Sequence, residues 1–292
     1  MPEFLLKVEG TIHTLSTPWI MGILNMTPDS FYSGSRFSGA QEAAKRAEEM
    51  IADGAKIIDI GGYSSRPGAD AVSPEEEWQR LETIVPAVRA VVNNHPGTFI
   101  SVDTFRAEVA EKAVAAGAHM VNDISGGNLD SRMYEVVAKL QVPYIIMHMQ
   151  GDPSTMQINP TYKHVTQDIV KFFSEKLPQL HALGIHDTVV DVGFGFGKTL
   201  AHNYQLLREL HAFQLLGRPI LTGVSRKSMI YNALNTSAEK SLNGTTALHM
   251  AALLEGSNIL RVHDVKEAAE TITLFKQLMP DGINHLLQPW ER

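Results

Sequence analysis

Short apolar runs alternate with helical patterns along most of the chain. Eight of these runs are almost continuously apolar, and they cover residues 19–25, 56–61, 98–103, 119–123, 143–148, 188–193, 219–224 and 258–263. Strands that are buried on both faces of a parallel sheet have this composition, whereas half-exposed strands alternate apolar and polar residues. The pattern therefore predicts eight parallel strands.

Helical patterns occupy the intervals between these runs. They include residues 39–54, 73–92, 104–117, 241–255 and 264–278. The second of them opens with Ser73 as an N-cap, Pro74 in the first turn and three glutamates near the positive end of the helix dipole. Eight strands alternating with helices in 292 residues predict an α/β fold, a (β/α)8 TIM barrel that forms a single domain over residues 1–292. A doubly wound open sheet is the alternative.

The N-terminal segment has a different pattern. Residues 4–16 alternate apolar and polar positions and contain Glu9-Gly10 at their centre. Alternation around a two-residue turn of this kind is typical of a β-hairpin. We expect a short N-terminal hairpin that plugs the bottom of the barrel.

Composition narrows the class of protein. The chain is 44% hydrophobic, has a formal net charge of −7 and contains no cysteine. This balance argues against a nucleic-acid partner, which usually meets a basic face, and against disulfide or thiolate-metal chemistry. The sequence shows no signal segment and no apolar run that approaches the 18 or so residues of a membrane span. We expect a cytoplasmic protein with no membrane partner.

Polar residues follow most of the predicted strands, where the active sites of (β/α)8 barrels form. They are Asn25, Ser65, Arg66, Asp103, Asn122, Asp123, His148, Asp191, Arg226, Lys227, Ser228, Arg261 and His263. Any one of them could simply cap the following helix. Burying so many carboxylates, amides and cations at one rim is costly, however, unless they bind ligands or pair with each other.

The kinds of group at this rim indicate the kind of ligand. The cationic side chains suit an anion: Arg66, Lys227, Arg261 and His263. The predicted strand before Lys227 and the one that carries Arg261 and His263 belong to the usual phosphate corner of this fold. The acceptors suit the N–H groups of a flat, nitrogen-rich ring: Asp103, Asn122 and Asp191. Met147 is placed to floor such a ring. The rim therefore predicts a site for a heterocycle that carries a phosphate or diphosphate.

Three loops need separate interpretation. Residues 26–39 and 62–74 are longer than most connections of this kind and suit mobile binding loops. The stretch DVGFGFGKTL at residues 191–200 is glycine-rich, but Val192 stands where a P-loop needs glycine, and the spacing also fails the dinucleotide fingerprint. The candidate group in this stretch is therefore Asp191 rather than a phosphate cradle.

Eight short motifs, taken together and in order, resemble the dihydropteroate synthase family of pterin-binding enzymes. Within residues 20–265 they read GILNMTPDSF, GGYSSRPGA, SVDT, VNDISGG, MHMQGDP, DVGFGFGKTLAHN, GVSRKS and RVHDV. The resemblance implies a transferase of folate biosynthesis that joins 6-hydroxymethyl-7,8-dihydropterin diphosphate to p-aminobenzoate, giving 7,8-dihydropteroate and pyrophosphate. It also implies Mg²⁺ as a cofactor, a homodimer, and competition by sulfonamides.

The same resemblance implies roles for individual residues. The catalytic residues would be Asp103, Asp191, Lys227 and Arg66. The pterin site would contain Asp103, Asn122, Met147, Asp191, Gly195, Phe196, Lys227 and Arg261. The diphosphate would meet Asn25, Arg66, Arg261 and His263, with Asn25 also the Mg²⁺ ligand. The p-aminobenzoate site would contain Ser65, Pro67, Lys227 and Ser228.

Three positions depart from the family's usual pattern. Ser65 replaces threonine, Tyr63 replaces glutamate, and Val192 replaces proline. The alternatives are a pterin-dependent methyltransferase barrel, a non-catalytic pterin-binding paralogue, and an aldolase-type barrel that uses Lys227 as a Schiff base. The complete set of cations and loop motifs favours the synthase.

Overall fold

The computed structural model describes residues 3–25, 36–63, 72–153, 155–156 and 159–279. Eight parallel strands form a closed barrel in the order β10-β3-β4-β5-β6-β7-β8-β9. They are β3 (Trp19–Asn25), β4 (Ile57–Gly61), β5 (Phe99–Asp103), β6 (Met120–Asp123), β7 (Tyr144–Met147), β8 (Thr188–Asp191), β9 (Ile220–Thr222) and β10 (Ile259–Val262). Because β10 pairs with β3, the sheet closes on itself. The predicted barrel is confirmed, and the open sheet is excluded.

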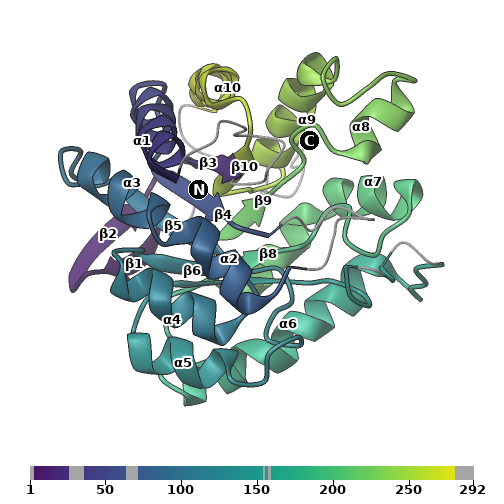
Figure 1. Cartoon of the computed structure of the whole chain (residues 1–292). Helices are drawn as coiled ribbons and strands as arrows, with labels where there is room; N and C mark the ends of the chain where they lie inside the picture. Colours follow the sequence, from purple (N-terminus) through teal and green to yellow (C-terminus); the bar gives the residue numbers. More distant parts are fainter. Residues whose placement is uncertain (1–2, 26–35, 64–71, 154, 157–158, 280–292) are drawn as a thin grey trace.

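Helices surround the barrel on its outer face (Figure 1). They are α1 (Arg36–Ala52), α2 (Pro74–Leu81), α3 (Ile84–Val92), α4 (Ala107–Ala115), α5 (Met133–Leu140), α6 (Val165–Ala182), α7 (Leu200–Arg208), the 3-10 helix η1 (Leu210–Leu216), α8 (Ser228–Ala233), α9 (Leu242–Leu254) and α10 (Val265–Leu278). Among the described residues, no helix combines the length and apolar character needed to cross a membrane.

One helix prediction was wrong in its extent. Residues 73–92 form two helices, α2 and α3, rather than one. Pro86 explains the break. In a continuous helix its ring would collide with the carbonyl oxygen of Glu82, and its nitrogen, which carries no hydrogen, could not donate to that oxygen. The predicted start of the segment is confirmed, since Ser73 accepts a hydrogen bond from the backbone N–H of Glu76 in a capping box.

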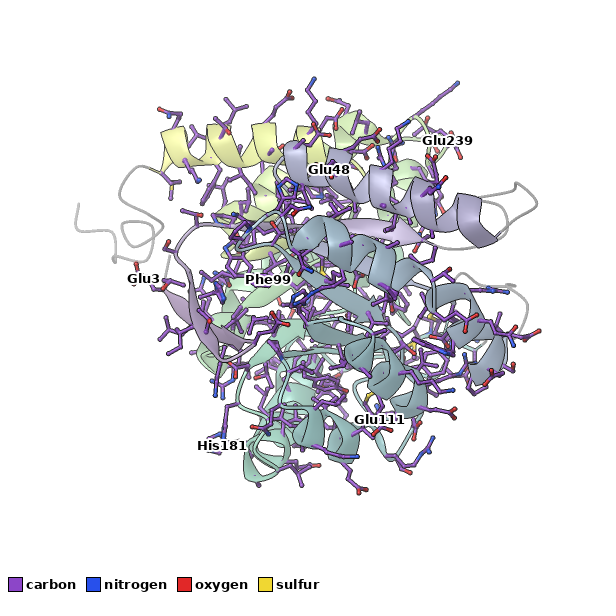
Figure 2. The ribbon with its side chains drawn as sticks, turned by 60° about the vertical axis from the view of Figure 1, so that its left-hand side comes forward. Glu3, Glu48, Phe99, Glu111, His181 and Glu239 are labelled. Atoms are coloured by element: carbon purple, nitrogen blue, oxygen red, sulfur yellow. The ribbon has the colours of Figure 1, made fainter. Side chains whose placement is uncertain are left out.

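The N-terminal hairpin closes one end of the barrel, as predicted. Strands β1 (Phe4–Val8) and β2 (Thr11–Leu15) pair antiparallel, and both turn residues, Glu9 and Gly10, have positive φ. Leu6, Val8 and Leu15 pack against apolar side chains in the barrel interior. Phe99, labelled in Figure 2, belongs to this cluster, and its ring centroid lies 4.8 Å from that of His13. This end of the barrel is therefore filled by apolar side chains.

The barrel interior changes from apolar to polar along the strands. Residues two apart on a strand share a face, so the residues two or four positions after each apolar residue near the hairpin also face the barrel interior. The apolar residues in this cluster include Ile57, Phe99, Met120, Val189 and Ile259. Two or four residues further on stand Asp59, Ser101, Asp103, Asn122, Asp191 and Arg261. The polar groups therefore gather toward the carboxyl end of the barrel, opposite the hairpin.

Candidate active site

An arginine paired with two carboxylates lies at the centre of the polar layer. Arg261 Nε donates to Asp59 Oδ2 at 2.7 Å, and Nη2 donates to Asp103 Oδ2 at 2.7 Å. Asp59 is fully buried, and the Asp103 and Arg261 side chains are each 18% exposed. Burial raises the pKa of Asp103 to about 7, although the charge of Arg261 opposes the rise. Strands β4, β5 and β10 thus meet in one ion-pair cluster.

Asp59 is a site residue that the sequence analysis missed. Its Oδ2 also accepts a hydrogen bond from Nδ2 of Asn122 at 3.2 Å. We looked for polar groups at strand ends, and Asp59 lies in the middle of β4. The signal was nevertheless present, because a carboxylate inside the apolar run KIIDIG needs a buried partner.

A second carboxylate and a lysine adjoin this cluster. Asp191 is 5% exposed, and its Oδ1 accepts the backbone N–H of Gly193 at 2.8 Å. Burial raises the pKa of Asp191, and the charges of Lys227 and Arg261 oppose the rise. Burial lowers the pKa of Lys227 to about 8, while Asp191 acts against the fall. The charges of buried Asp191 and half-buried Lys227 therefore stabilise each other beside Arg261.

Lys227 is held by the glycine-rich loop. Its Nζ donates to the carbonyl oxygen of Phe194 at 2.6 Å and lies 4.8 Å from the ring centroid of Phe196. A side chain at Gly195 would touch Cδ of Lys227, and a side chain at Gly223 would approach both Lys227 Nζ and Arg261 Cβ. Glycine at these positions leaves room for the two cations.

The glycine-rich loop is shaped by backbone contacts. Gly193, Gly195 and Gly197 all have positive φ, and a Cβ at Gly193 would collide with the carbonyl oxygen of His148. The loop therefore packs directly on the segment that follows β7. Its alternating glycines reflect this close approach, while Asp191 at the end of β8 contributes the chemistry.

Lys198 fixes this loop from within, a role that the sequence analysis also missed. The residue is 3% exposed, and Nζ donates to the carbonyl oxygens of Gly193 at 2.8 Å and Phe196 at 3.0 Å. It also lies 3.2 Å from Nδ1 of His148. Thr199 caps α7, whereas Lys198 points inward. His148 is a structural partner here.

An apolar cluster borders the charged groups. Its buried members are Ile124, Met147, Met149 and Met156, and the half-buried rings of Phe105 and Phe196 pack against them. Met147 is 2% exposed and stands at the end of β7, beside Asp191 in the sheet register. Methionine and phenylalanine offer a polarisable surface for a flat ring. The sheet thus places the expected floor residue next to the expected acceptor.

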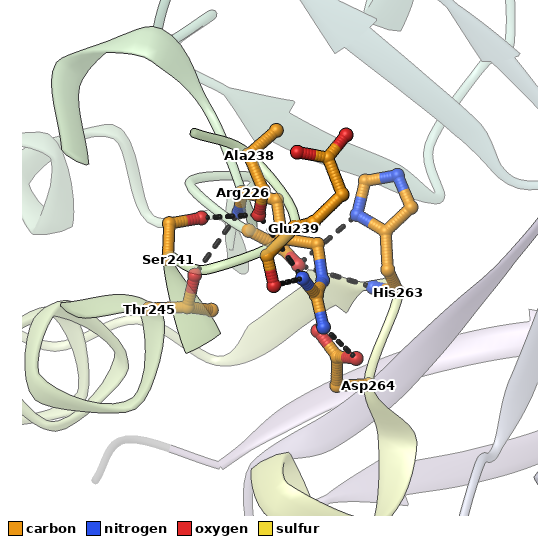
Figure 3. Close-up of polar contacts among 8 residues, drawn as sticks. Arg226, Ala238, Glu239, Ser241, Thr245, His263 and Asp264 are labelled. Carbon is orange, nitrogen blue, oxygen red and sulfur yellow. Dashed lines mark hydrogen bonds and ion pairs between the residues drawn. The ribbon is translucent and has the colours of Figure 1, made fainter. Parts of the chain in front are cut away.

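Arg226 binds Asp264 and two backbone carbonyl oxygens rather than a member of the charged cluster (Figure 3). Its Nε and Nη2 donate to Asp264 at 2.8 and 2.7 Å, and its Nη1 donates to the carbonyl oxygens of Ala238 and Glu239. The residue has a φ of 53°. Arg226 therefore stabilises the loops around α8 and α10 rather than the rim.

His263 faces Ser225, which follows the neighbouring strand β9. Its backbone N–H donates to Ser225 Oγ at 3.2 Å, and the same oxygen lies 3.1 Å from the ring Nδ1. Burial, helped by the charge of Arg261, lowers the pKa of His263 to about 4. The ring is therefore neutral at pH 7. Donation from the serine hydroxyl to Nδ1 would leave Nε2 as the N–H donor.

Comparison with known proteins identifies the family. Residues 21–263 match the pterin binding enzyme family. The chain is 43% identical over 269 residues to the dihydropteroate synthase of Escherichia coli (strain K12), covering 91% of this chain and 94% of that protein. It is 42% identical over 264 residues to that of Haemophilus influenzae, covering 90% and 94%.

The chain belongs to the dihydropteroate synthase family.

Solved structures of this family agree with the barrel. That of the Yersinia pestis dihydropteroate synthase with a sulfonamide drug complex superposes with a TM-score of 0.86 at 40% identity, over 94% of this chain and 99% of that one. The Xanthomonas albilineans dihydropteroate synthase with 4-aminobenzoic acid gives 0.86 at 37% identity, over 95% and 98%. The resemblance drawn from the motifs is confirmed, and the activity is that of a dihydropteroate synthase, a transferase.

The remaining predicted residues of the dihydropteroate synthase site fall into two groups. Ser65, Arg66 and Pro67 lie outside the described residues, as do most of the two long loops, so their roles stay predictions. Asn25 ends β3 and Ser228 begins α8 directly after Lys227, and both are half-buried. Where described, the predicted residues thus come from strand ends and loops around one barrel mouth.

Proposed function

We propose that this barrel mouth binds 6-hydroxymethyl-7,8-dihydropterin diphosphate and p-aminobenzoate and joins them to give 7,8-dihydropteroate and pyrophosphate. The supporting observation is that Asp191 and Lys227 lie beside Arg261 and its two carboxylates at one barrel mouth. Such a cluster supplies acceptors for ring N–H groups on one side and donors for an anion on the other.

The acceptors of the cluster suit the pterin ring. Asp103 and Asp191 accept hydrogen bonds as carboxylates, and Asn122 accepts through Oδ1. Among the described residues Lys227 donates only to the carbonyl oxygen of Phe194, so donors of its Nζ remain for an acceptor atom of the ring. Met147 and Phe196 border the same space and would contact the ring face, as would Gly195 beneath Lys227. This arrangement would hold the ring with its methylene group toward the open end.

In the bond-exchange step, the amine nitrogen of p-aminobenzoate bonds to the pterin methylene carbon as the C–O bond to the diphosphate breaks. The bonding electrons leave with pyrophosphate, and the new secondary amine loses a proton to water. Positive charge spreads from the methylene carbon into the ring, and the carboxylates of Asp103 and Asp191 stabilise it. Arg261 and the Nε2–H of His263 would meet the departing negative charge, together with Arg66.

The residues at the end of β3 fit a Mg²⁺ ion that is shared with the substrate. An added Cβ at Gly61 would lie 3.7 Å from both Asn25 Oδ1 and Asp103 Oδ2, so two oxygens border the space above this glycine. Within the described residues, no three acidic, histidine or cysteine side chains are grouped to hold a metal. Mg²⁺ is commonly bound by one or two protein oxygens together with substrate phosphates and water. With Asn25 as its ligand, Mg²⁺ would neutralise leaving-group charge.

The direct test measures p-aminobenzoate consumption together with pyrophosphate release, with and without Mg²⁺. We expect one pyrophosphate for each p-aminobenzoate consumed, and loss of turnover after chelation. Pterin binding without turnover would instead indicate the non-catalytic paralogue. Methyl transfer without pyrophosphate release would indicate the methyltransferase, and borohydride trapping at Lys227 would indicate the Schiff-base aldolase.

The pH dependence of kcat/KM should be bell-shaped. Asp103 must be ionised to accept a hydrogen bond and Lys227 must be protonated to donate one, and burial brings their pKa values to about 7 and about 8. Activity should therefore rise as pH passes about 7 and fall above about 8, as apparent values of the coupled site. Asp103→Asn should remove the acidic limb. An unchanged acidic limb in this variant would contradict the assignment.

We also propose a cytoplasmic homodimer. Helix α9 supports the assembly because several of its large apolar side chains are not fully buried: Ala252 and Leu253 are buried, while Leu242, Leu248 and Met250 are only partly covered. A second copy of the chain would cover this face. Analytical ultracentrifugation should give twice the 32.1 kDa of one chain. A monomer at all concentrations would exclude the dimer, and cell fractionation would test the location.

A further inference from the structure

Asp59 connects two residues of the proposed substrate site through a single oxygen. Its Oδ2 accepts from Arg261 Nε at 2.7 Å and from Asn122 Nδ2 at 3.2 Å. Asp59 is 0% exposed and Asn122 is 2% exposed, so neither contact is replaced by bulk water. The other carboxylate oxygen, Oδ1, is buried without a hydrogen-bond partner among the described residues. Among the described residues, the hydrogen bonds and ion pair of this carboxylate therefore all go through Oδ2.

This contact determines which way the amide of Asn122 faces. A carboxylate paired with arginine offers only acceptors, whereas an amide has a donor end and an acceptor end. If the amide were reversed, Asn122 Oδ1 would face Asp59 Oδ2 at about the separation that Nδ2 has now. Two buried oxygens would then face each other without a proton between them. The NH2 group must therefore face Asp59. Asn122 makes no other side-chain hydrogen bond within the described part of the chain, so Oδ1 and one amide proton remain for a ligand.

We propose that Asp59 is a positioning residue that fixes the donor–acceptor direction of Asn122 and so makes the site select a 2-amino-pteridine over its 2-oxo counterpart. The inference rests on the proposed pterin substrate. A pterin edge carries an amino donor beside N1, an acceptor, which matches Oδ1 and the free N–H of a fixed amide. A lumazine edge carries a 2-oxo acceptor beside an N1–H donor, the reverse pattern. Only an amide turned by 180° would match it.

The test compares two ligands that differ only at this edge. Fluorescence titration at pH 7 gives the Kd values of 6-hydroxymethylpterin and 6-hydroxymethyllumazine, neither of which carries the diphosphate. Wild-type protein should prefer the pterin by about a hundredfold or more, because the lumazine would leave buried polar groups unpaired. In Asp59→Leu the amide is free to turn, and the preference should fall by at least about tenfold.

The matched control is Asp59→Asn. Its side-chain oxygen can still accept from both Arg261 and Asn122, so the ligand preference should stay within about twofold of wild type although the charge is gone. Turnover should nevertheless decrease, because Arg261 loses a counter-charge. The conservative variant thus separates the direction of the amide from the ion pair.

Each outcome has a definite meaning. If Asp59→Leu weakens both ligands equally and keeps their ratio, Asp59 only supports Arg261 and the inference is wrong. If wild-type protein binds neither ligand and forms no dihydropteroate, the proposed function fails instead. Should Asp59→Leu not fold, Asp59→Ser leaves room for a water molecule, which can donate or accept, and the same fall in preference is expected of it.

Discussion

Replacing Asp191 by alanine should lower kcat/KM by about a hundredfold to a thousandfold, the usual effect of removing one preorganised group that stabilises transition-state charge. Asp191 is 5% exposed, and among the described residues its side chain accepts one hydrogen bond, from the backbone N–H of Gly193. One oxygen therefore remains for a ligand, and in the proposed function its negative charge would stabilise the cation that forms at the methylene carbon. Steady-state kinetics with the diphosphate substrate and p-aminobenzoate measure the loss.

Lys227→Ala should lower kcat/KM by a similar factor, although it removes a positive charge rather than a negative one. Asp191 would lose the neighbouring charge that opposes the rise of its pKa on burial. More of the carboxyl would then be protonated at pH 7, and the ring would also lose a donor. Because the two groups act as a unit, the double variant should be little worse than either single variant.

A matched control lies next to the same strand, at its opposite end. Asp187 immediately precedes β8, at the hairpin end of the barrel, and accepts the backbone N–H of Lys7 at 2.8 Å. Asp187→Ala should leave kcat/KM within about twofold of wild type, because residues at that end of such barrels contribute to stability rather than chemistry. Near-normal kcat/KM in Asp191→Ala, with circular dichroism unchanged, would remove this residue from the catalytic site.

Much of the barrel could be predicted because burial on both faces leaves a clear mark on the sequence. The run at residues 19–25 became β3 without any change of bounds, and the hairpin turn fell on Glu9 and Gly10 as expected. The break between α2 and α3 could not be read from hydrophobic pattern alone, since apolar positions continue through it. The deciding residue, Pro86, acts through backbone sterics instead.

The site was only partly predictable, for a different physical reason. Asp103, Asn122 and Asp191 were found because they lie at the carboxyl ends of strands, where the fold rule looks. Asp59 and Lys198 were missed because their roles depend on partners far along the chain: Asp59 binds Arg261, and Lys198 binds carbonyl oxygens that no sequence pattern reveals. Positioning residues are therefore harder to predict than the groups that they position.

Arg261→Met should produce the largest loss of stability among the rim substitutions. The change removes the only arginine paired with Asp59 and Asp103 among the described residues and leaves two buried carboxylates facing each other. Breaking a buried ion pair from one side typically costs about 3–5 kcal/mol. Urea denaturation should therefore show a lower midpoint, and turnover should also fall because the departing diphosphate would lose one of the two guanidinium groups proposed to meet it. Arg132→Met is the control, since Arg132 is 64% exposed and pairs with Asp130 at the surface.

The pH dependence of this stability loss distinguishes charge from packing. The pKa of Asp103 is raised to about 7, mainly by burial. The charge of Arg261 lowers this pKa and that of Asp59 raises it, so removing Arg261 must raise the pKa further. Between the ordinary aspartate pKa of about 4 and the raised value, the folded state binds more protons than the unfolded state, so stability falls as pH rises. The free energy of unfolding of Arg261→Met should therefore be closer to wild type at pH 5 than at pH 8. An equal deficit at both pH values would mean that Arg261 stabilises the barrel through packing, and that the carboxylates do not need its charge.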